Sequence, residues 1–308
     1  MIKRFIERLK PLETATIFFY FLMTVTNIIF AGRIEQWLFL VPINILIIGT
    51  VYLIGVYDTK KNSRLSMFFR FLYPIGLIFF TFKEIYWMLK PIRPYDYDWL
   101  LIAIDNMIFG ANPTRVLIKI ANPVLTEILQ IAYNSFYILP ITLVLSLILQ
   151  KRFKEANYAS FSVVYGFYLS YIAYFALPAV GPRFTLHDFS LINSELPGLW
   201  ATNFLREMVN TGESIPSGTL NPIAVVQRDV FPSGHTMMTL IVFYLAVKFK
   251  DKTRFVIIPL GMLLIFGTVY LRYHYAVDLL GGLFSMIFSI LTGNKLYKYL
   301  NSIHNNKF

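Results

Sequence analysis

The sequence predicts an all-α fold, a polytopic membrane helix bundle with about eight transmembrane helices. Hydrophobic residues make up 56% of the 308 positions, and the mean hydropathy is +0.59. A soluble domain of this length would not carry so much apolar surface. Several apolar segments approach the ~20 residues that a helix needs to cross a bilayer. Lysine and arginine gather in the short segments between them, a distribution typical of membrane topology.

Eight apolar segments account for the hydropathy, and each is expected to form one span. Their approximate bounds are 14–31, 36–56, 66–89, 126–149, 157–177, 234–249, 254–272 and 276–298. In the third segment, Lys83 and Glu84 interrupt the apolar run near one end. We expect both side chains to extend to the membrane interface, as long charged side chains near helix ends usually do.

The basic segments predict the orientation of the chain. They alternate with the spans and therefore fall on one side, which the positive-inside rule assigns to the cytoplasm. Eight crossings then place both termini inside, as expected for an integral protein of a bacterial inner membrane. The basic N-terminus lacks a small-residue cleavage site, which favours a retained first span over a signal peptide. The net charge of +11 is thus explained by topology and does not indicate nucleic-acid binding.

The segments on the opposite, non-cytoplasmic side carry the polar residues of interest. Residues 96–121 are expected to form one or two amphipathic pieces on the membrane surface. The Asn112-Pro113 and Asn122-Pro123 pairs mark turns there. The chain shows no obvious internal repeat, which argues against a transporter built from inverted repeats. We treat it as a single membrane domain.

The stretch RDVFPSGHTMMT (228–239) predicts a helix start that suits an anion. Ser233 is a natural N-cap for the apolar run that follows. The first N–H groups of a helix have no partner inside it, and they carry the positive end of its dipole. Gly234 allows an anion to approach the backbone closely. The alternative interpretation is a capped helix with an interfacial histidine, His235.

A second cluster, LRYHYAVD, lies at another span end on the same side of the membrane. His274 and Asp278 are four residues apart, so on a helix they share one face and can form a hydrogen bond. A carboxylate that holds one ring nitrogen fixes the tautomer and leaves the other nitrogen free to attack an electrophile. Both clusters therefore predict one shallow site that contains His235, His274 and Asp278.

These residues resemble the signatures of the type 2 phosphatidic acid phosphatase superfamily, which includes the vanadium haloperoxidases. The family motif P-S-G-H matches residues 232–235, and the histidine and aspartate of S-R-x5-H-x3-D match His274 and Asp278. The resemblance implies a six-helix catalytic core, here residues 66–308, with residues 1–65 as two additional N-terminal helices. It also implies that His274 attacks phosphorus, that Asp278 orients it, and that His235 acts as general acid and base.

The chain departs from the family pattern at two places. Thr268 stands where the family has the arginine of its last signature, and the K-x6-R-P motif is missing in that form. The fifth span ends instead in PAVGPRFTLH, which places Arg183 at the equivalent point of the topology. This variant, with DNMIFGANP (105–113), YNSFYILP (133–140) and the motif H-Y-x-x-D, resembles the branch of the fungal inositol phosphorylceramide synthases and their bacterial relatives.

Two arginines are candidates for holding the phosphate, together with Ser233 and Gly234. Arg183 and Arg228 each offer a planar guanidinium that can donate two hydrogen bonds to a phosphoryl group. The alternative for either is contact with lipid headgroups, which we also expect for Arg272. His187 is expected to be an ordinary loop histidine.

Four further residues of interest lie in the two motifs that resemble the synthase branch, DNMIFGANP and YNSFYILP. Asp105 and Asn112 are expected mainly to form turns, and the resemblance adds a role in shaping the lipid site. For Tyr133 and Asn134, two alternatives are open: they line the cavity, or they belong to an aromatic belt at the membrane interface.

The function expected from these features is a membrane-embedded lipid phosphotransferase or phosphatase that works through a phosphohistidine. A lipid alcohol such as ceramide or diacylglycerol as acceptor makes it a transferase, as the branch resemblance favours. Water makes it a phosphatase acting on phosphatidic acid or a polyprenyl pyrophosphate. This chemistry needs no metal and no cofactor. Two alternatives remain: a transporter, and a metal site formed by His235, His274 and Asp278.

Overall fold

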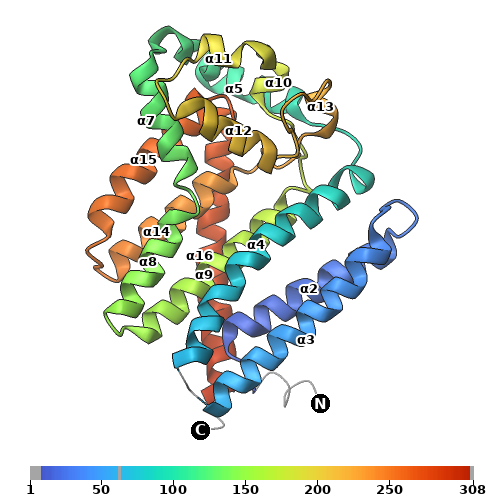
Figure 1. Cartoon of the computed structure of the whole chain (residues 1–308), viewed down its shortest axis with the longest axis vertical. Coiled ribbons are helices and arrows are strands. Elements are labelled where there is room, and N and C mark those ends of the chain that lie inside the picture. Colours follow the sequence, from blue (N-terminus) through green and yellow to red (C-terminus); the bar gives the residue numbers. More distant parts are fainter. Residues whose placement is uncertain (1–7, 62–63, 306–308) are drawn as a thin grey trace. The chain divides into compact units, whose positions relative to one another are not determined.

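The computed structural model describes residues 8–61 and 64–305, and within these ranges every regular element is a helix. Figure 1 shows helices throughout the chain, long ones and a group of short ones. Since several of the helices are long and apolar, the chain is a polytopic helical membrane protein, and the predicted fold class is confirmed.

Each of the eight expected spans corresponds to a helix or a pair of helices. These are α2 (Pro11–Ile29), α3 (Trp37–Lys61), α4 (Arg64–Ile92), the pair α7 (Pro123–Asn134) and α8 (Ile138–Leu149), α9 (Phe153–Ala173), α14 (Gly234–Lys248), α15 (Arg254–Tyr270) and α16 (Ala276–Asn305). By length and apolar composition, four helices of the described chain can cross a membrane: α2, α3, α4 and α16. The α7–α8 pair makes a fifth, while α14 and α15 are apolar but shorter.

The fourth expected span, predicted over residues 126–149, is divided between two helices and bent. α7 and α8 meet at 54° across a break at residues 135–137. At the break, the Ser135 hydroxyl donates to the carbonyl oxygen of Ala132 at 2.6 Å. Such a local hydrogen bond offers the backbone an alternative to continuing the helix. The bend brings Tyr133 and Phe136 to a stretch of chain about a hundred residues away, as described below.

The short helices come from the two long segments that the sequence places outside the membrane. They are α5 (Asp98–Phe109), α6 (Pro113–Leu117), η1 (Ile118–Ile120), α10 (Pro182–Thr185), η2 (Phe189–Leu191), α11 (Ile192–Glu195), α12 (Thr202–Gly212) and α13 (Pro222–Val225). Asn112 and Asn122, expected at turns, are the N-cap residues of α6 and α7. The Asn122 side chain accepts a hydrogen bond from Leu125 N at 2.9 Å.

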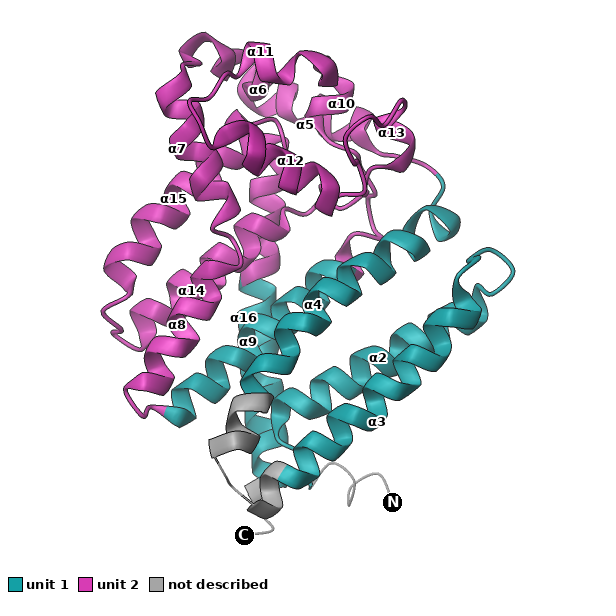
Figure 2. Cartoon of the chain, in the orientation of Figure 1, with its two compact units in different colours: residues 1–94, 153–171, 287–308 teal, residues 95–152, 172–286 magenta. Residues whose placement is uncertain are grey.

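The chain forms two compact units, coloured separately in Figure 2. Unit 1 contains residues 1–94, 153–171 and 287–308, and unit 2 contains residues 95–152 and 172–286. α16 contributes to both, because its first residues belong to unit 2 and the remainder to unit 1. The boundary predicted at residue 65 separates two additional N-terminal helices from the six-helix catalytic core. It is a different kind of division from these compact units, and it stays a prediction.

Unit 1 corrects the expectation for Glu84. In this unit, α2 and α3 run antiparallel side by side (Figure 1). The Glu84 side chain is fully buried and does not extend to an interface. Its Oε1 atom accepts hydrogen bonds from Asn27 Nδ2 at 2.9 Å and from Asn44 Nδ2 at 2.7 Å. Polar partners on two neighbouring helices hold the carboxyl group inside the protein, which apolar periodicity alone does not reveal.

Unit 2 contains every residue that the sequence singled out for chemistry. Within it, α14 and α15 pack together, and α15 packs against α7. The short helices α5 and α10 to α13 gather over one end of these longer helices (Figure 2). The Ser233 end of α14 and the turn between α15 and α16 lie near each other in this unit, as the hydrogen bonds below show.

Candidate active site

The helix start predicted at Ser233 is present. Ser233 is the N-cap of α14, and its side-chain oxygen accepts a hydrogen bond from Thr236 N at 3.2 Å. Gly234 is the first helical residue and is buried, and His235 follows it in the first turn. A start of this kind leaves N–H groups without helical partners, which is the local requirement for binding an anion.

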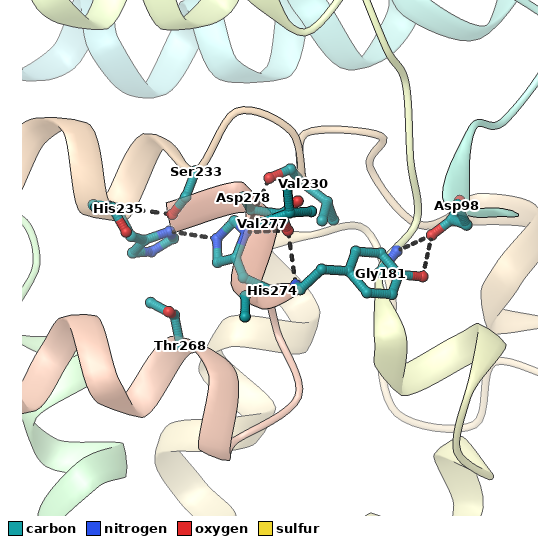
Figure 3. A network of polar contacts seen from close by, with 12 residues as sticks. Asp98, Gly181, Val230, Ser233, His235, Thr268, His274, Val277 and Asp278 are labelled. Atoms are coloured by element: carbon teal, nitrogen blue, oxygen red, sulfur yellow. Dashed lines mark hydrogen bonds and ion pairs between the residues drawn. The ribbon is translucent and has the colours of Figure 1, made fainter. Parts of the chain in front are cut away.

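His274 and Asp278 are in contact, although they do not share one helix. His274 lies in the turn that follows α15, two residues before α16 begins, and Asp278 lies in the first turn of α16. The distance from His274 Nδ1 to Asp278 Oδ2 is 3.3 Å (Figure 3). The same carboxylate oxygen accepts a hydrogen bond from Tyr275 N at 2.8 Å. Asp278 therefore anchors the turn as well as the imidazole.

The tautomer of His274 follows from a second contact of its Nδ1 atom. Nδ1 lies 2.9 Å from the carbonyl oxygen of Val230, and a carbonyl oxygen only accepts hydrogen bonds. Nδ1 must therefore carry a proton, and in the neutral ring Nε2 holds the free lone pair. Burial lowers the pKa of His274 to about 4, an effect that the nearby Asp229 and Glu213 carboxylates partly offset. The ring is thus neutral near pH 7.

His235 faces the free nitrogen of His274. Its Nδ1 atom lies 3.4 Å from His274 Nε2 (Figure 3). Two aromatic rings hold it in this position. Tyr133 stacks on His235 with ring centroids 4.5 Å apart, and Phe136 packs against it at 4.3 Å. These rings come from the bend between α7 and α8, so the broken span has a direct role in placing His235.

The first turn of α16 is held by Asp105, a residue for which the sequence predicted mainly turn formation. Asp105 is fully buried in α5. Its carboxylate accepts hydrogen bonds from Ala276 N at 3.0 Å and from Val277 N at 2.8 Å. These are N–H groups of a helix start, which prefer a negative partner. Asp105 thus fixes the helix that carries Asp278 from a position 171 residues away in the chain.

Asp98, for which the sequence predicted no role, joins the backbone just before Arg183 to the turn that contains His274. Its carboxylate accepts hydrogen bonds from Val180 N at 3.0 Å, Gly181 N at 2.8 Å and the Tyr275 hydroxyl at 2.7 Å. Gly181 has a φ of +98°, and a Cβ there would lie 3.1 Å from Tyr273 O. Only glycine suits that backbone conformation together with so close an approach.

Two adjacent glycines let α16 approach the PSGH segment. A Cβ at Gly281 would lie 2.8 Å from a ring carbon of Phe231, and one at Gly282 would lie 2.7 Å from Ser233 O. The Ser233 N–H donates to the carbonyl oxygen of Asp278 at 3.1 Å. The two signature segments are therefore packed backbone to backbone, a relationship that their wide separation in sequence conceals.

Arg183 lies in the same unit and acts on the site electrostatically. Its guanidinium is buried, donates to Asn210 Oδ1 at 3.0 Å and forms an ion pair with Glu213. It also lies over the ring of Tyr273 at 4.9 Å. The charges of Arg183 and Glu213 both affect the pKa of His274, in opposite directions.

Arg228 makes its contacts away from the two histidines. Its Nε atom pairs with Asp96 Oδ1 at 3.2 Å, and its Nη2 atom donates to Ile223 O at 3.1 Å. Asp229, the next residue, does act on the site. Burial, and then the Glu213 carboxylate, raise the pKa of Asp229, and its charge in turn raises the pKa of His274. Asp229 lies within the motif RDVFPSGHTMMT, and the sequence alone predicted no role for it.

The structure corrects the expectation that Arg272 contacts lipid headgroups. Arg272 is 1% exposed and forms an ion pair with Glu195. Thr268 does not substitute for the missing arginine, since its hydroxyl donates to Ile265 O at 2.7 Å within its own helix. Its carbonyl oxygen accepts from both Tyr273 N and His274 N at 3.0 Å. Thr268 thus supports the turn through its backbone.

The remaining candidates have ordinary local roles in the structure. His187 is half-buried, and its Nε2 atom lies 3.0 Å from Thr114 Oγ1. In the described part of the chain, no three His, Asp or Glu side chains gather in an arrangement that could hold a metal ion. His235, His274 and Asp278 are close in space, but Asp278 contacts the Nδ1 side of His274 and His235 faces Nε2.

Comparisons with known proteins agree with this geometry. Residues 99–292 match the family model described as the PAP2 superfamily. A PA-phosphatase related-family protein of Dictyostelium discoideum is 28% identical to the chain over 186 residues, which cover 54% of this chain. The match covers 32% of the Dictyostelium protein, so the chain spans about a third of that relative's length. No solved structure matches the chain.

Proposed function

Because the chain belongs to the PAP2 superfamily, we propose that it is a membrane-embedded, phosphatase-type enzyme that removes the phosphoryl group of a lipid phosphate through a phosphohistidine. One observation carries the proposal most directly. His274 Nδ1 is bonded to the carbonyl oxygen of Val230, which leaves Nε2 with its lone pair facing His235. A buried neutral imidazole with a defined free nitrogen has the properties that a nucleophile requires.

In the first step, His274 Nε2 attacks phosphorus, and the bond from phosphorus to the leaving oxygen breaks. His235 gives a proton to that oxygen, so the product leaves as a neutral alcohol. Asp278 stabilises the positive charge that forms on the imidazole ring of His274. In the second step, His235 takes a proton from the acceptor hydroxyl, whose oxygen attacks phosphorus and breaks the bond to Nε2.

We assign the phosphate oxygens to the start of α14 and to Arg183. The first turn of α14 offers the N–H groups of Gly234 and His235 as donors, while the Ser233 N–H is bonded to the carbonyl oxygen of Asp278. The planar guanidinium of Arg183 can donate two hydrogen bonds to the phosphate. The ion pair between Arg183 and Glu213 must then be shared with the phosphate or broken. Arg228 would have to release Asp96 in the same way, so we give it the lesser role.

For the finer chemistry, we propose transfer of a phosphodiester headgroup to a lipid alcohol, like that of the inositol phosphorylceramide synthases. The charges of Asp229 and Glu213 support a diester donor, since both carboxylates act on His274. A phosphomonoester carries about two negative charges near neutral pH, and a diester carries one. Two nearby carboxylates therefore oppose the monoester more strongly, and they can accept hydrogen bonds from a hydroxylated headgroup. Hydrolysis of a lipid phosphate is the alternative.

The test uses purified enzyme and candidate lipids labelled in the phosphate, with and without ceramide or diacylglycerol. Label in a new lipid, formed only when the alcohol is present, supports transfer. Label in free phosphate supports hydrolysis of a monoester, and label in a released headgroup phosphate supports hydrolysis of a diester. Absence of turnover with every lipid phosphate and diester would contradict the proposal.

A further inference from the structure

The buried carboxyl group of Glu84 in unit 1 has no role in the proposed reaction. Glu84, Asn27 and Asn44 lie on α4, α2 and α3, and all three side chains are 0% exposed. An ionisable side chain inside a membrane-spanning segment is unfavourable, and where one is found it usually serves binding or transport. The arrangement around Glu84 indicates what it binds.

Only some of the polar side-chain atoms of these three residues form hydrogen bonds. Both asparagine amides donate to a single atom, Glu84 Oε1. The orientation of Asn27 is fixed independently, because its Nδ2 atom also donates to Met23 O at 3.0 Å. The other oxygen of each of these side chains is buried without a hydrogen-bond partner in the described part of the chain: Asn27 Oδ1, Asn44 Oδ1 and Glu84 Oε2.

Both amide oxygens lie in the neighbourhood of the Glu84 carboxylate. In one amide group the oxygen and nitrogen are about 2.3 Å apart. Since both amide nitrogens lie within 2.9 Å of Glu84 Oε1, each amide oxygen lies within about 5 Å of the same carboxylate atom. The carboxylate thus receives two amide donors on Oε1, has two further acceptor oxygens nearby, and has no donor to Oε2 in the described part of the chain.

The neighbouring groups do not provide the missing positive charge. Lys83 is next to Glu84 in the chain, but its Nζ atom lies over the ring of Tyr86 at 4.8 Å. The hydroxyl of Tyr20, another polar group between α2 and α4, is engaged with Thr81 Oγ1 at 2.7 Å. Arg70, a buried arginine on α4, is paired with Glu13 at 2.5 Å.

We propose that Asn27, Asn44 and Glu84 form a binding site for a monovalent alkali cation. Carboxylate and amide oxygens are the ligands that hard cations prefer. One negative carboxylate and two neutral amides match a single positive charge, whereas a divalent ion would leave a net charge buried, which is unfavourable. A single proton on Oε2 would satisfy that oxygen and one amide oxygen, and it would leave the other amide oxygen unpaired.

The site joins three helices, so cation binding stabilises the folded state of unit 1. A ligand that binds only the folded protein raises the melting temperature in proportion to the logarithm of its concentration. The proposal is independent of the enzymatic function, because every residue of the site lies in unit 1 and the candidate catalytic residues lie in unit 2.

The experiment measures thermal unfolding of the full chain in lipid nanodiscs at constant pH and ionic strength, with sodium chloride replacing choline chloride. The wild-type Tm should rise by about 3 °C for each tenfold increase in sodium above the dissociation constant. Glu84→Gln should lose this dependence. Glu13→Gln removes another buried carboxylate of unit 1 and should keep it, as should His274→Ala in unit 2.

A direct binding measurement covers the case in which Glu84→Gln does not fold. Radioactive sodium should bind to the wild-type protein and bind at least tenfold more weakly to Asn44→Ala. Equal Tm in sodium and choline, or equal sodium binding by wild type and Asn44→Ala, would overturn the proposal. A Tm that responds to pH through Glu84 but not to sodium would also overturn it, since a proton would then be the occupant.

Discussion

The Nδ1 atom of His274 lies 2.9 Å from the carbonyl oxygen of Val230, 44 residues earlier in the chain. Because the carbonyl oxygen can only accept, this contact sets which nitrogen of His274 carries the proton. The contact between His274 and Asp278, at 3.3 Å, is longer. The backbone of the segment that leads into PSGH therefore fixes the tautomer, and the carboxylate chiefly supplies charge and anchors the turn.

The two histidines should be separable by phosphoenzyme formation. His274→Ala should abolish turnover and acid-labile phosphoprotein, since it removes the attacking nitrogen. His235→Ala should lose about 10²–10⁴ in turnover, yet it should still form phosphoenzyme from an activated ester with a good leaving group, and label should accumulate on it. Acid-labile label is measured on protein incubated with the labelled ester. Label on the His274→Ala protein would refute these roles.

The pH dependence of kcat/KM should reveal the charges around His274. The nucleophile must be neutral, and its pKa is lowered to about 4, so the acid limb should lie near pH 4. Glu213→Gln removes a negative charge that raises this pKa, and the limb should move to lower pH. Arg183→Gln removes a positive charge that lowers it, and the limb should move to higher pH. Shifts of the same sign in both variants would contradict the assignment.

Asp105 should behave as a positioning residue for the turn that carries His274. Asp105→Asn replaces a charged acceptor of two N–H groups, and hydrogen bonds to charged groups contribute about 1.5–3 kcal/mol each. We expect kcat to fall tenfold to a hundredfold with little change in KM. Asp188→Asn is the matched control, since Asp188 is exposed and, among the described residues, accepts hydrogen bonds only from Ser190. Equal kinetics for the two variants would contradict a positioning role for Asp105.

Gly282 should not tolerate even a methyl group. Its Cβ would approach Ser233 O to 2.7 Å and the Thr236 Cβ to 2.8 Å, so α16 and the start of α14 must separate. We expect Gly282→Ala to lose about 1–3 kcal/mol of stability and most of its activity. Gly76→Ala, in a long helix with open space around the added carbon, is the control and should melt at or above the wild-type temperature. Tm and initial rates measure both effects.

The orientation in the membrane can be tested with introduced cysteines, because the chain has none of its own. Leu220 is fully exposed in the loop between α12 and α13. Leu220→Cys should react with an impermeant maleimide in intact cells if the site opens to the non-cytoplasmic side. Lys252→Cys, beyond the other end of α14, should react only after lysis. The reverse pattern would overturn the orientation.

By itself, the sequence determined the features that depend on neighbours along the chain. Apolar segments of membrane-spanning length predict the helical class, and a serine before an apolar run predicts the N-cap at Ser233. The spacing of His274 and Asp278 predicts their contact, although the two residues meet across a turn and not along a helix. These features follow from hydrogen bonds and side-chain positions within a few residues, which local patterns encode.

Only the tertiary structure decided which distant groups meet. The partners of Asp105 are backbone N–H groups 171 and 172 residues away, and Glu84 binds asparagines of two other helices. Arg272, expected at the membrane surface, is buried against Glu195. A buried polar group must find a partner, but the identity of that partner depends on how helices pack. Hydrophobic periodicity along one segment carries no information about that packing.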